Sequence, residues 1–343
     1  MRIAMLTGGG DCPGLNAVIR SVARSSIDRG DEVVGVLRGW RGMIEGQTRP
    51  LGGHEVSGLL PRGGTILRTS RTNPFDVDGG VERVLEHLRG LDALVAIGGE
   101  DTLGVAARLN TEHGAHIVGV PKTIDNDLRG TDYTFGFDTA VSIATEAIDR
   151  LHSTAESHDR VMVCEVMGRH TGWIAVMAGM AGGADVILIP ELPMTVEHCC
   201  ELIKNRHARG KDFSIVVVSE GYELHYESGE SRGVASADVD AFGHARLGGV
   251  GAALASEIED RTGFETRVTT LGHIQRGGSP TARDRVLATR YGLKAAELVR
   301  EGAWGMMASL RGDDVVAVPI AEAVAELKLV PQELYDQAAV FFG

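Results

Sequence analysis

Short runs of consecutive hydrophobic residues recur along the chain, and stretches with helical periodicity lie between them. The runs cover residues 2–7, 33–37, 94–97, 117–120, 161–166, 186–189 and 215–218. A strand that is apolar along nearly its whole length is typical of a parallel sheet with both faces covered. Residues 140–151 instead show the spacing of an amphipathic helix. The alternation of the two patterns predicts an α/β, doubly wound fold.

The first predicted strand leads into a glycine turn and then into a helix. Consecutive glycines occupy residues 8–10, directly after the run at residues 2–7. We expect the helix to open at Pro13, because proline suits the first turn, and to close at Gly30. With the strand at residues 33–37, these elements form a βαβ unit.

Residues 222–246 interrupt the alternation. This segment is glycine-rich, polar and acidic, and it lies between a predicted strand and a helix that we expect to begin near Leu247. We interpret it as an excursion on the surface.

Length and composition narrow the class of protein. A chain of 343 residues exceeds the size at which one core usually stops growing, so two lobes are expected. The net charge of −13 disfavours nucleic acid and anionic membrane surfaces as partners, because both need a basic face. No apolar run approaches the roughly 20 residues that span a bilayer, and a signal-peptide pattern is absent. The spacing of Cys12, Cys164, Cys199 and Cys200 suggests neither a metal site nor disulfides. We therefore expect a cytoplasmic protein.

Two glycine-rich turns after predicted strands are candidates for binding phosphate. Gly9 and Gly10 stand in the first turn, and Gly99 stands in the second. The backbone N–H groups of such turns converge on an anion, and the following helix adds the positive end of its dipole. Dinucleotide-binding proteins also place glycines after a strand. The first turn lacks the G-x-G-x-x-G spacing, however, which argues against a Rossmann-type dehydrogenase.

Acidic residues follow the second glycine turn. Glu100 and Asp101 come directly after Gly99, and a carboxylate in this place is the hard oxygen ligand that Mg²⁺ prefers. The alternative for Glu100 is a first-turn acid that only complements the helix dipole.

A second set of acids follows the hydrophobic run at residues 117–120. Asp125 is the candidate general base, because an alcohol must lose its proton as it attacks a phosphoryl group. The alternative is a turn in which Asp and Asn residues serve backbone hydrogen bonding. That alternative explains Asn126 well, but it explains Lys122 and Thr123 poorly.

Four separated motifs together resemble the 6-phosphofructokinase family. They are GGGDCPGLN at residues 8–16, GGEDT at 98–102, PKTIDND at 121–127 and GHIQRGG at 272–278. The resemblance extends over nearly the whole chain. It implies two Rossmann-like lobes with largely parallel sheets. Residues 1–136 plus 275–325 would bind the phosphate donor, and residues 137–274 plus 326–343 would bind fructose 6-phosphate. It also implies Mg²⁺ as cofactor, at Glu100, where most relatives have aspartate.

The resemblance gives each catalytic candidate a role. Asp125 would be the base, while Asp127 and Thr123 would orient the hydroxyl and steady the transferring group. Lys122 would offset charge on the bridging oxygens. The glycine loops would wrap the donor phosphates, and Arg71 matches a family arginine that reaches the same group.

The residues that match the family's sugar-phosphate site are Arg160, Met167, Gly168, Arg169, Glu220, Arg267, His273 and Arg276. Arginine suits this role because its planar fork binds two phosphate oxygens together. The resemblance further implies that Arg160 and Arg267 reach the sugar phosphate of a neighbouring subunit. A homodimer or homotetramer with shared active sites would follow.

Asp101 bears on the identity of the donor. ATP-using relatives have glycine here, and a carboxylate about 4 Å from the α-phosphate would repel it by on the order of 4 kcal/mol. Relatives that use pyrophosphate carry this aspartate together with the lysine that matches Lys122. The sequence therefore predicts reversible transfer from pyrophosphate to the 1-hydroxyl of fructose 6-phosphate, in glycolysis and gluconeogenesis. An ATP-dependent phosphofructokinase and a non-catalytic sugar-phosphate-binding subunit are the alternatives.

The effector pocket of allosteric relatives is only partly kept, as Arg20, Arg24, Asp185 and Lys211. His152 stands where those relatives have arginine, and no arginine near His54 completes the basic cluster. We therefore expect little control by phosphorylated effectors.

Overall fold

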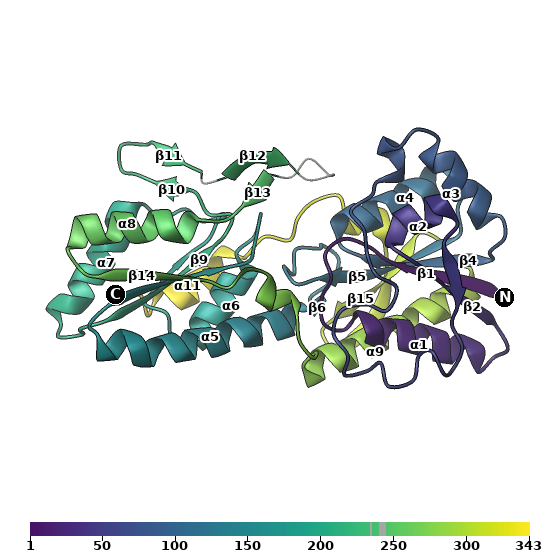
Figure 1. Ribbon diagram of the computed structural model, residues 1–343, viewed down its shortest axis with the longest axis horizontal. Coiled ribbons are helices and arrows are strands. Elements are labelled where there is room, and N and C mark those ends of the chain that lie inside the picture. Colours follow the sequence, from purple (N-terminus) through teal and green to yellow (C-terminus); the bar gives the residue numbers. More distant parts are fainter. Residues whose placement is uncertain (234, 240–244) are drawn as a thin grey trace. The chain divides into compact units, whose positions relative to one another are not determined.

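The computed structural model describes residues 1–233, 235–239 and 245–343. The chain forms two compact units, and each has its own sheet (Figure 1). Met1–Thr139 and Arg276–Leu327 belong to the first unit. The described parts of Ala140–Val239, together with Ala245–Gln275 and Lys328–Gly343, belong to the second.

A mixed sheet forms the centre of the first unit, in the order β16-β15-β5-β4-β1-β2-β3, with β6 paired to β5. The strands are β1 (Arg2–Thr7), β2 (Glu32–Val36), β3 (Thr48–Pro50), β4 (Ala93–Gly98), β5 (Ile117–Thr123), β6 (Phe135–Gly136), β15 (Met306–Arg311) and β16 (Asp314–Pro319). Most neighbours are parallel, while β2–β3 and β15–β16 are antiparallel. The strands β4 and β5 are buried along their whole length, as their apolar sequences predict.

Helices cover both faces of this sheet, as the doubly wound prediction requires. The helices are α1 (Leu15–Ile27), α2 (Gly39–Glu45), α3 (Gly80–Leu88), α4 (Glu100–His113), α9 (Ala282–Glu301) and α10 (Ile320–Ala323), with a 3-10 turn η1 (Pro74–Asp76). The helices α1 and α9 pack together on one face, and α2, α3 and α4 lie on the other (Figure 1).

The first helix begins at Leu15, and the prediction that it opens at Pro13 is wrong by two residues. Gly14 precedes the helix with a left-handed φ of 108°, so the helical geometry starts only after it. A Cβ at Gly14 would also lie 2.7 Å from a ring carbon of Phe135. Glycine is therefore required here both by the backbone and by the close approach of β6.

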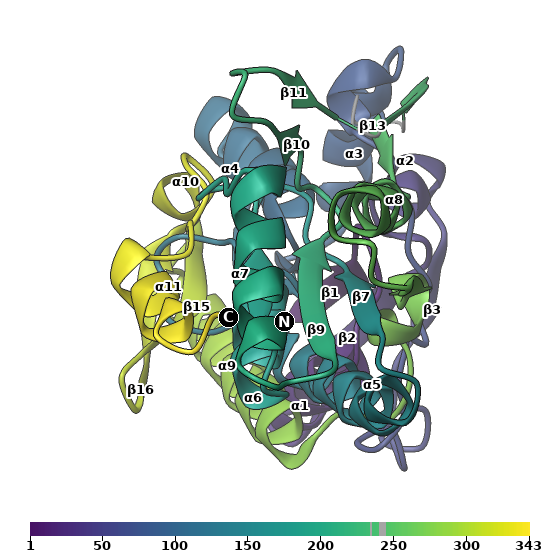
Figure 2. The same cartoon turned by 90° about the vertical axis from the view of Figure 1, so that its left-hand side faces the viewer.

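The second unit is built on a parallel sheet in the order β14-β7-β9-β8. Its strands are β7 (Val161–Val166), β8 (Val186–Leu188), β9 (Ser214–Ser219) and β14 (Thr266–Thr270), and its helices are α5 (Phe137–Ser157), α6 (Trp173–Ala181), α7 (Val196–Ala208), α8 (Val250–Thr262) and α11 (Gln332–Ala339). Helix α5 starts in the first unit and continues into the second. Hydrophobic residues of β7, β8 and β9 pack against α7 and α8, and Figure 2 shows the C-terminus next to α7.

The predicted excursion at residues 222–246 contains two small antiparallel pairs. One joins β10 (Leu224–His225) to β11 (Ser231–Arg232), and the other joins β12 (Ala235–Val239) to β13 (Ala245–Leu247). Residues 234 and 240–244 of the excursion lie outside the described residues. Helix α8 begins at Val250 and not near Leu247, because Gly248 and Gly249 before it have positive φ.

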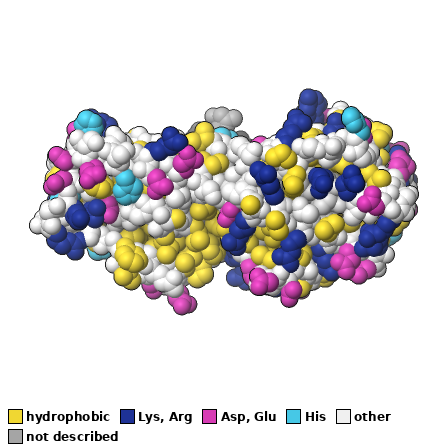
Figure 3. Space-filling model, turned by 90° about the horizontal axis from the view of Figure 1, so that it is seen from below, with side chains coloured by type: hydrophobic (Ala, Val, Ile, Leu, Met, Phe, Trp, Pro, Cys, Tyr) yellow, Lys and Arg dark blue, Asp and Glu magenta, His cyan; other side chains and the backbone are white. Residues whose placement is uncertain are grey.

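The surface of the first unit in Figure 3 carries Lys and Arg side chains among Asp, Glu and hydrophobic ones. The net negative charge of the chain therefore does not form a uniformly acidic face there, and local cationic sites remain available to anions. Within the described residues, each helix is too short or too polar to cross a membrane.

Candidate functional site

The glycine turns lie at the point where the sheet of the first unit changes its winding direction. From β1 the chain continues to β2 on one side, whereas β4 pairs with β1 on the other side. The carboxyl ends of β1 and β4 therefore flank a topological switch point, where open α/β sheets bind their ligands. Gly8, Gly9 and Gly10 follow β1, and Gly99 follows β4.

The two glycine turns are fastened to each other and to a third segment. The Gly8 N–H donates to Ile97 O of β4 at 3.0 Å, and the Gly9 N–H donates to Ser70 O at 3.3 Å. The Thr69 hydroxyl donates to Gly9 O at 2.5 Å. Arg71, the predicted donor-phosphate ligand, is thus the next residue after a direct contact of the first turn.

Thr102 fills the space between the two turns. A Cβ on Gly8 would lie 2.4 Å from Thr102 Oγ1, and a Cβ on Gly98 would lie 2.3 Å from Thr102 Cβ. Its backbone carbonyl accepts a hydrogen bond from the Trp40 indole at 3.3 Å. Sequence reasoning missed Thr102, although its place in the GGEDT motif was a signal.

Two cationic side chains lie against the first glycine turn. Lys122, at the end of β5, is buried and donates from Nζ to Gly10 O at 2.5 Å. Arg276 donates from Nη1 to Asp11 O at 3.3 Å, and a Cβ on Gly10 would lie 2.6 Å from this nitrogen. Burial, reinforced by the nearby Arg276 charge, lowers the pKa of Lys122. Arg276, predicted to hold sugar phosphate, therefore lies at the donor turn of the first unit.

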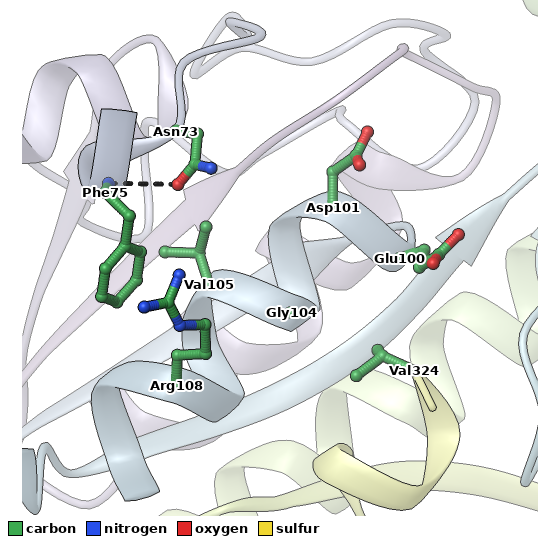
Figure 4. Close-up of a pocket in the computed structure, with 8 residues that line it drawn as sticks. All are labelled: Asn73, Phe75, Glu100, Asp101, Gly104, Val105, Arg108 and Val324. Atoms are coloured by element: carbon green, nitrogen blue, oxygen red, sulfur yellow. Dashed lines mark hydrogen bonds between the residues drawn. The ribbon is translucent and has the colours of Figure 1, made fainter. Parts of the chain in front are cut away.

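The first turn of α4 carries Glu100 and Asp101 beside a pocket of about 230 Å³ (Figure 4). The pocket is lined by Asn73, Phe75, Glu100, Asp101, Gly104, Val105, Arg108 and Val324. Its walls are mainly apolar, and the two carboxylates stand at the opposite end from Arg108. The Arg108 guanidinium lies over the Phe75 ring, 3.5 Å from its centroid, and pairs with Glu112 at 3.0 Å. This stacking was not predicted from the sequence.

The turn after β5 holds the predicted catalytic acids. The Asp125 N–H donates to Thr123 Oγ1 at 3.0 Å. Asn126 has a left-handed φ of 51°, and its side-chain oxygen accepts from the Thr134 N–H at 3.1 Å. The turn interpretation of Asn126 is therefore correct. This interpretation accounts for Asn126. It does not account for the acids on either side, Asp125 and Asp127.

Electrostatics distinguish Asp127 from an ordinary surface acid. Burial raises its pKa to about 7, and the negative charges of Asp125 and, more weakly, Glu100 act in the same direction. A hydrogen bond from the Thr123 hydroxyl offsets part of this rise. Asp125 and Glu100 are thus close enough to Asp127 for their negative charges to favour its protonated form.

In the second unit, the predicted sugar residues follow the carboxyl ends of three adjacent strands. They are Met167, Gly168 and Arg169 after β7, Glu220 after β9, and His273 after β14. The Glu220 N–H donates to Val166 O at 2.8 Å, and Gly168 O accepts from Ser219 Oγ at 2.7 Å. These residues are therefore gathered at one edge of the sheet.

Arg160 and Arg267 lie at the amino ends of the strands of the same sheet, opposite the carboxyl ends that carry Met167 and Glu220. Arg160 precedes β7 and Arg267 is near the start of β14, so the six residues of β7 separate them from Met167 by roughly 20 Å. Both arginines pair with Glu265. The Arg160 Nε is buried and has no hydrogen-bond partner among the described residues. One small ligand cannot contact both edges of one sheet.

The predicted effector positions are partly occupied by internal contacts. Asp185 is buried, pairs with Arg206 at 2.9 Å and accepts from the Ile215 N–H at 2.8 Å. The His152 ring nitrogen Nε2 lies 2.7 Å from Gly182 O. Asp185 thus has structural contacts that account for its presence.

Glycine turns at a switch point, with a buried lysine and interacting carboxylates, are the arrangement expected of an α/β phosphotransferase. A family model described as "Phosphofructokinase" matches residues 2–299. The chain belongs to the phosphofructokinase family, and its fold is the phosphofructokinase fold.

Similar proteins carry two different donor names. The chain is 59% identical over 347 residues, covering 100% of both chains, to the pyrophosphate–fructose 6-phosphate 1-phosphotransferase of Amycolatopsis mediterranei. It is 53% identical, again with 100% of both chains covered, to the ATP-dependent 6-phosphofructokinase of Mycobacterium tuberculosis.

Among solved structures, phosphofructokinase from Pichia pastoris in the T-state superposes with a TM-score of 0.82 at 34% identity, covering 94% of this chain and 35% of that longer chain. A pyrophosphate-dependent phosphofructokinase from Marinobacter aquaeolei has a TM-score of 0.80 at 24% identity, covering 97% and 86%, and supports the fold alone.

Proposed function

We propose that the protein transfers a phosphoryl group from pyrophosphate to the 1-hydroxyl of fructose 6-phosphate, giving fructose 1,6-bisphosphate and phosphate. The observation that carries the proposal is Asp101, on the first turn of α4 directly after the second glycine turn. Its carboxylate would repel the α-phosphate of a nucleotide, whereas pyrophosphate has no third phosphate to place there. The names of the 57–59% identical relatives support the same donor. We place the reaction in cytoplasmic glycolysis and gluconeogenesis.

The first unit would hold and polarise the donor. N–H groups of Gly10 and Gly99 would bind the phosphate oxygens, and the α4 N-terminus would add its dipole. The Gly9 N–H already donates to Ser70 O, so Gly9 would instead shape the first turn through its left-handed φ of 74°. Lys122 donates to Gly10 O of the first turn, so it would lie beside the bond that breaks if the donor phosphates bind there. Its positive charge would stabilise the phosphate that leaves.

The residues of the β5 turn would act on the acceptor. Asp125 would accept the proton of the 1-hydroxyl as this oxygen attacks the transferring phosphorus. Asp127 would orient the hydroxyl. Thr123, whose hydroxyl donates to Asp127, would steady the transferring group by holding this carboxylate in place. The presence of Asp125, Asp127 and Thr123 together disfavours a purely sugar-binding subunit.

Magnesium is the proposed cofactor, with Glu100 as its protein ligand. No group of three or more His, Cys, Asp or Glu residues among the described ones forms a metal cage. A single carboxylate, that of Glu100, fits Mg²⁺, which is usually held by one or two carboxylates, substrate phosphates and water. When bound, Mg²⁺ would neutralise charge on the pyrophosphate oxygens.

The second unit would supply the sugar site. Met167, Gly168, Arg169, Glu220 and His273 would hold the sugar body and its phosphate at the carboxyl edge of the sheet. Arg160 and Arg267, at the opposite edge, would serve the site of a second copy of the chain. We therefore propose a homodimer or homotetramer in which each active site needs two chains.

Subunit complementation tests this arrangement. Asp125→Asn and Arg267→Ala should each be nearly inactive alone, but randomly mixed dimers should regain about a quarter of wild-type activity, because half of the molecules then hold one intact site. Co-expressed, differently tagged chains and a coupled assay give the measurement. The matched control pairs Asp125→Asn with His273→Ala, whose defects fall in the same chain's site. Recovery in the control, or none in the test pair, would contradict the proposal.

An ATP-dependent enzyme is the second candidate. Two observations favour it: the 53% identical relatives that are named for ATP, and the apolar pocket beside Asp101. The flat Phe75 ring and the side chains of Val105 and Val324 form the kind of wall on which a nucleoside base could pack.

Initial rates with the two donors decide between these candidates. With fructose 6-phosphate and Mg²⁺, we expect pyrophosphate to support a rate at least about a hundredfold above that with ATP, which corresponds to roughly 3 kcal/mol of discrimination. An aldolase-coupled assay under identical conditions provides the measurement. The opposite preference would assign the enzyme to ATP, and inactivity with both donors would favour the binding subunit.

A further inference from the structure

The first turns of α5 and α9 are hydrogen-bonded to each other. Thr281, the N-cap of α9, accepts a hydrogen bond from the Asp284 N–H at 3.3 Å. In an ordinary capping box, the side chain of the residue three positions on would bond back to the N–H of the cap residue. Here the Thr281 N–H donates instead to Thr139 Oγ1 of α5 at 3.0 Å. Asp284 Oδ2 accepts from the Thr139 N–H at 2.8 Å and from its hydroxyl at 2.6 Å.

These hydrogen bonds are buried. Asp284 is 0% exposed and Thr139 is 3% exposed, so each unsatisfied group would be costly. The Thr281 hydroxyl donates to Asp138 Oδ2 at 2.7 Å and thereby extends the contact along α5. Of the two Asp284 oxygens, Oδ1 is the one without a hydrogen-bond partner among the described residues.

The surroundings of Asp284 disfavour its charged form. Burial raises its pKa to about 6, and the Asp138 carboxylate from α5 acts in the same direction. The neighbouring Cys12 is a neutral thiol, since burial raises its pKa to about 12. Tyr133 shares Asp138 through its hydroxyl, and the Arg283 guanidinium lies over its ring. Ionised Asp284 therefore lowers the stability of the fold above about pH 6, and a role in function would explain its presence.

The capped turn leads directly to the catalytic residues. Helix α5 starts immediately after β6, whose two residues pair with Lys122 and Thr123 at the end of β5. The Thr134 hydroxyl, just before β6, donates to Thr123 O at 2.8 Å. On its other side, Phe135 contacts the phosphate turn, where its carbonyl lies 3.7 Å from Cys12 Sγ. The short strand β6 thus supports both the phosphate turn and the end of β5.

We propose that Asp284 is a positioning residue for phosphoryl transfer, which acts through Thr139 and β6 on Lys122 and Thr123. The carboxylate fixes the turn from β6 into α5, and β6 in turn fixes the end of the catalytic strand. The inference rests on the proposed catalytic roles of Lys122 and Thr123, but it is independent of which donor is used.

Substitutions of Thr139 separate positioning from folding. Thr139→Val keeps the shape but removes the hydroxyl, and we expect kcat to fall between tenfold and about a hundredfold, as small displacements of reacting groups do. KM for both substrates should change less than about twofold, because ground-state binding is retained. Thr139→Ser should restore kcat to near the wild-type value. Thr145→Val, further along α5, is the matched control, since its hydroxyl donates only within the helix turn at Val141 and kcat should not change.

Asp284→Asn supplies a readout that a purely structural role would not give. At pH 8, we expect its melting temperature to equal or exceed that of the wild type, because a buried charge is removed, while kcat falls at least tenfold. The ratio of wild-type to variant kcat should shrink as pH drops through about 6, since Asp284 then becomes protonated. Taking this ratio cancels the titration of Asp127, which both proteins share.

Several outcomes would overturn the inference. These are an unchanged kcat in Thr139→Val, a Thr139→Ser variant as slow as Thr139→Val, or a pH-independent ratio for Asp284→Asn. Strictly additive losses of kcat in the double variant Thr139→Val/Asp284→Asn would also overturn it, because residues that act as one unit are non-additive. All assays use whichever donor the wild type accepts. A wild type inactive with both donors would remove the proposed function, and the inference with it, before any variant is compared.

Discussion

Asp125→Asn is expected to lower kcat by about two to four orders of magnitude, the range that loss of a positioned general base produces. The amide keeps the size of the side chain and, with it, the turn that the Asp125 N–H forms with Thr123 Oγ1. Fructose 6-phosphate should therefore still bind. Steady-state rates and calorimetric titration with fructose 6-phosphate provide the measurement.

Asp132→Asn is the matched control, because this acid lies outside the turn and accepts from the Gly312 N–H at 2.7 Å. Its kcat should stay near the wild-type value. A near-normal rate in Asp125→Asn would remove Asp125 as the base, and loss of sugar binding would assign it a binding role instead.

The same variant should change the pH dependence. Because burial raises the pKa of Asp127 to about 7, this carboxyl can accept a hydrogen bond from the 1-hydroxyl only once it ionises, so the wild-type rate should rise as pH increases through this value. Removing the Asp125 charge removes one of the causes that raise the pKa of Asp127. The acidic limb of the residual activity should accordingly move to lower pH.

Asp101→Gly is expected to raise kcat/KM for ATP by between tenfold and about a thousandfold. The upper figure corresponds to removing about 4 kcal/mol of repulsion between two charges about 4 Å apart at an effective dielectric of about 20. Partial exposure of the first turn of α4 screens this interaction, which sets the lower figure. Activity with pyrophosphate should fall much less.

Asp101→Asn separates charge from volume in this argument. If repulsion dominates, the amide should give most of the gain in ATP use, and if crowding dominates, only glycine should. A parent enzyme that already prefers ATP, with no gain in either variant, would show that Asp101 turns away from the donor.

The apolar strands were the most predictable part of the fold. β4 and residues 117–120 of β5 are buried and consist of hydrophobic residues and glycine, so their burial follows from the local sequence. The burial of Lys122 and Thr123 at the end of β5 does not follow from it. The start of α1 was misplaced by two residues, because the left-handed Gly14 depends on the approach of Phe135 from a distant strand. Local propensity cannot report such a contact.

In the candidate site, too, features set by local sequence were predictable and features set by distant contacts were not. Glycine turns and carboxylates stand in contiguous motifs, and the fold brings Gly9, Gly99 and Lys122 to one edge of the first sheet. Arg276 shows the limit, since its motif gave no sign that its guanidinium would lie at Gly10. Asp284 and Thr139 are 145 residues apart, and neither was predicted to have a role. Partners at such separation are fixed by packing and not by the neighbouring sequence.

The first turn of α4 has an evolutionary consequence. Glu100 and Asp101 belong to one helix end, while the predicted sugar residues other than Arg276 belong to the second unit, which has its own sheet. One substitution at that helix end could therefore change the phosphoryl donor without changing the residues that bind the sugar. Lineages could cross between donors in either direction by short mutational routes, which fits relatives of 59% and 53% identity that bear different donor names.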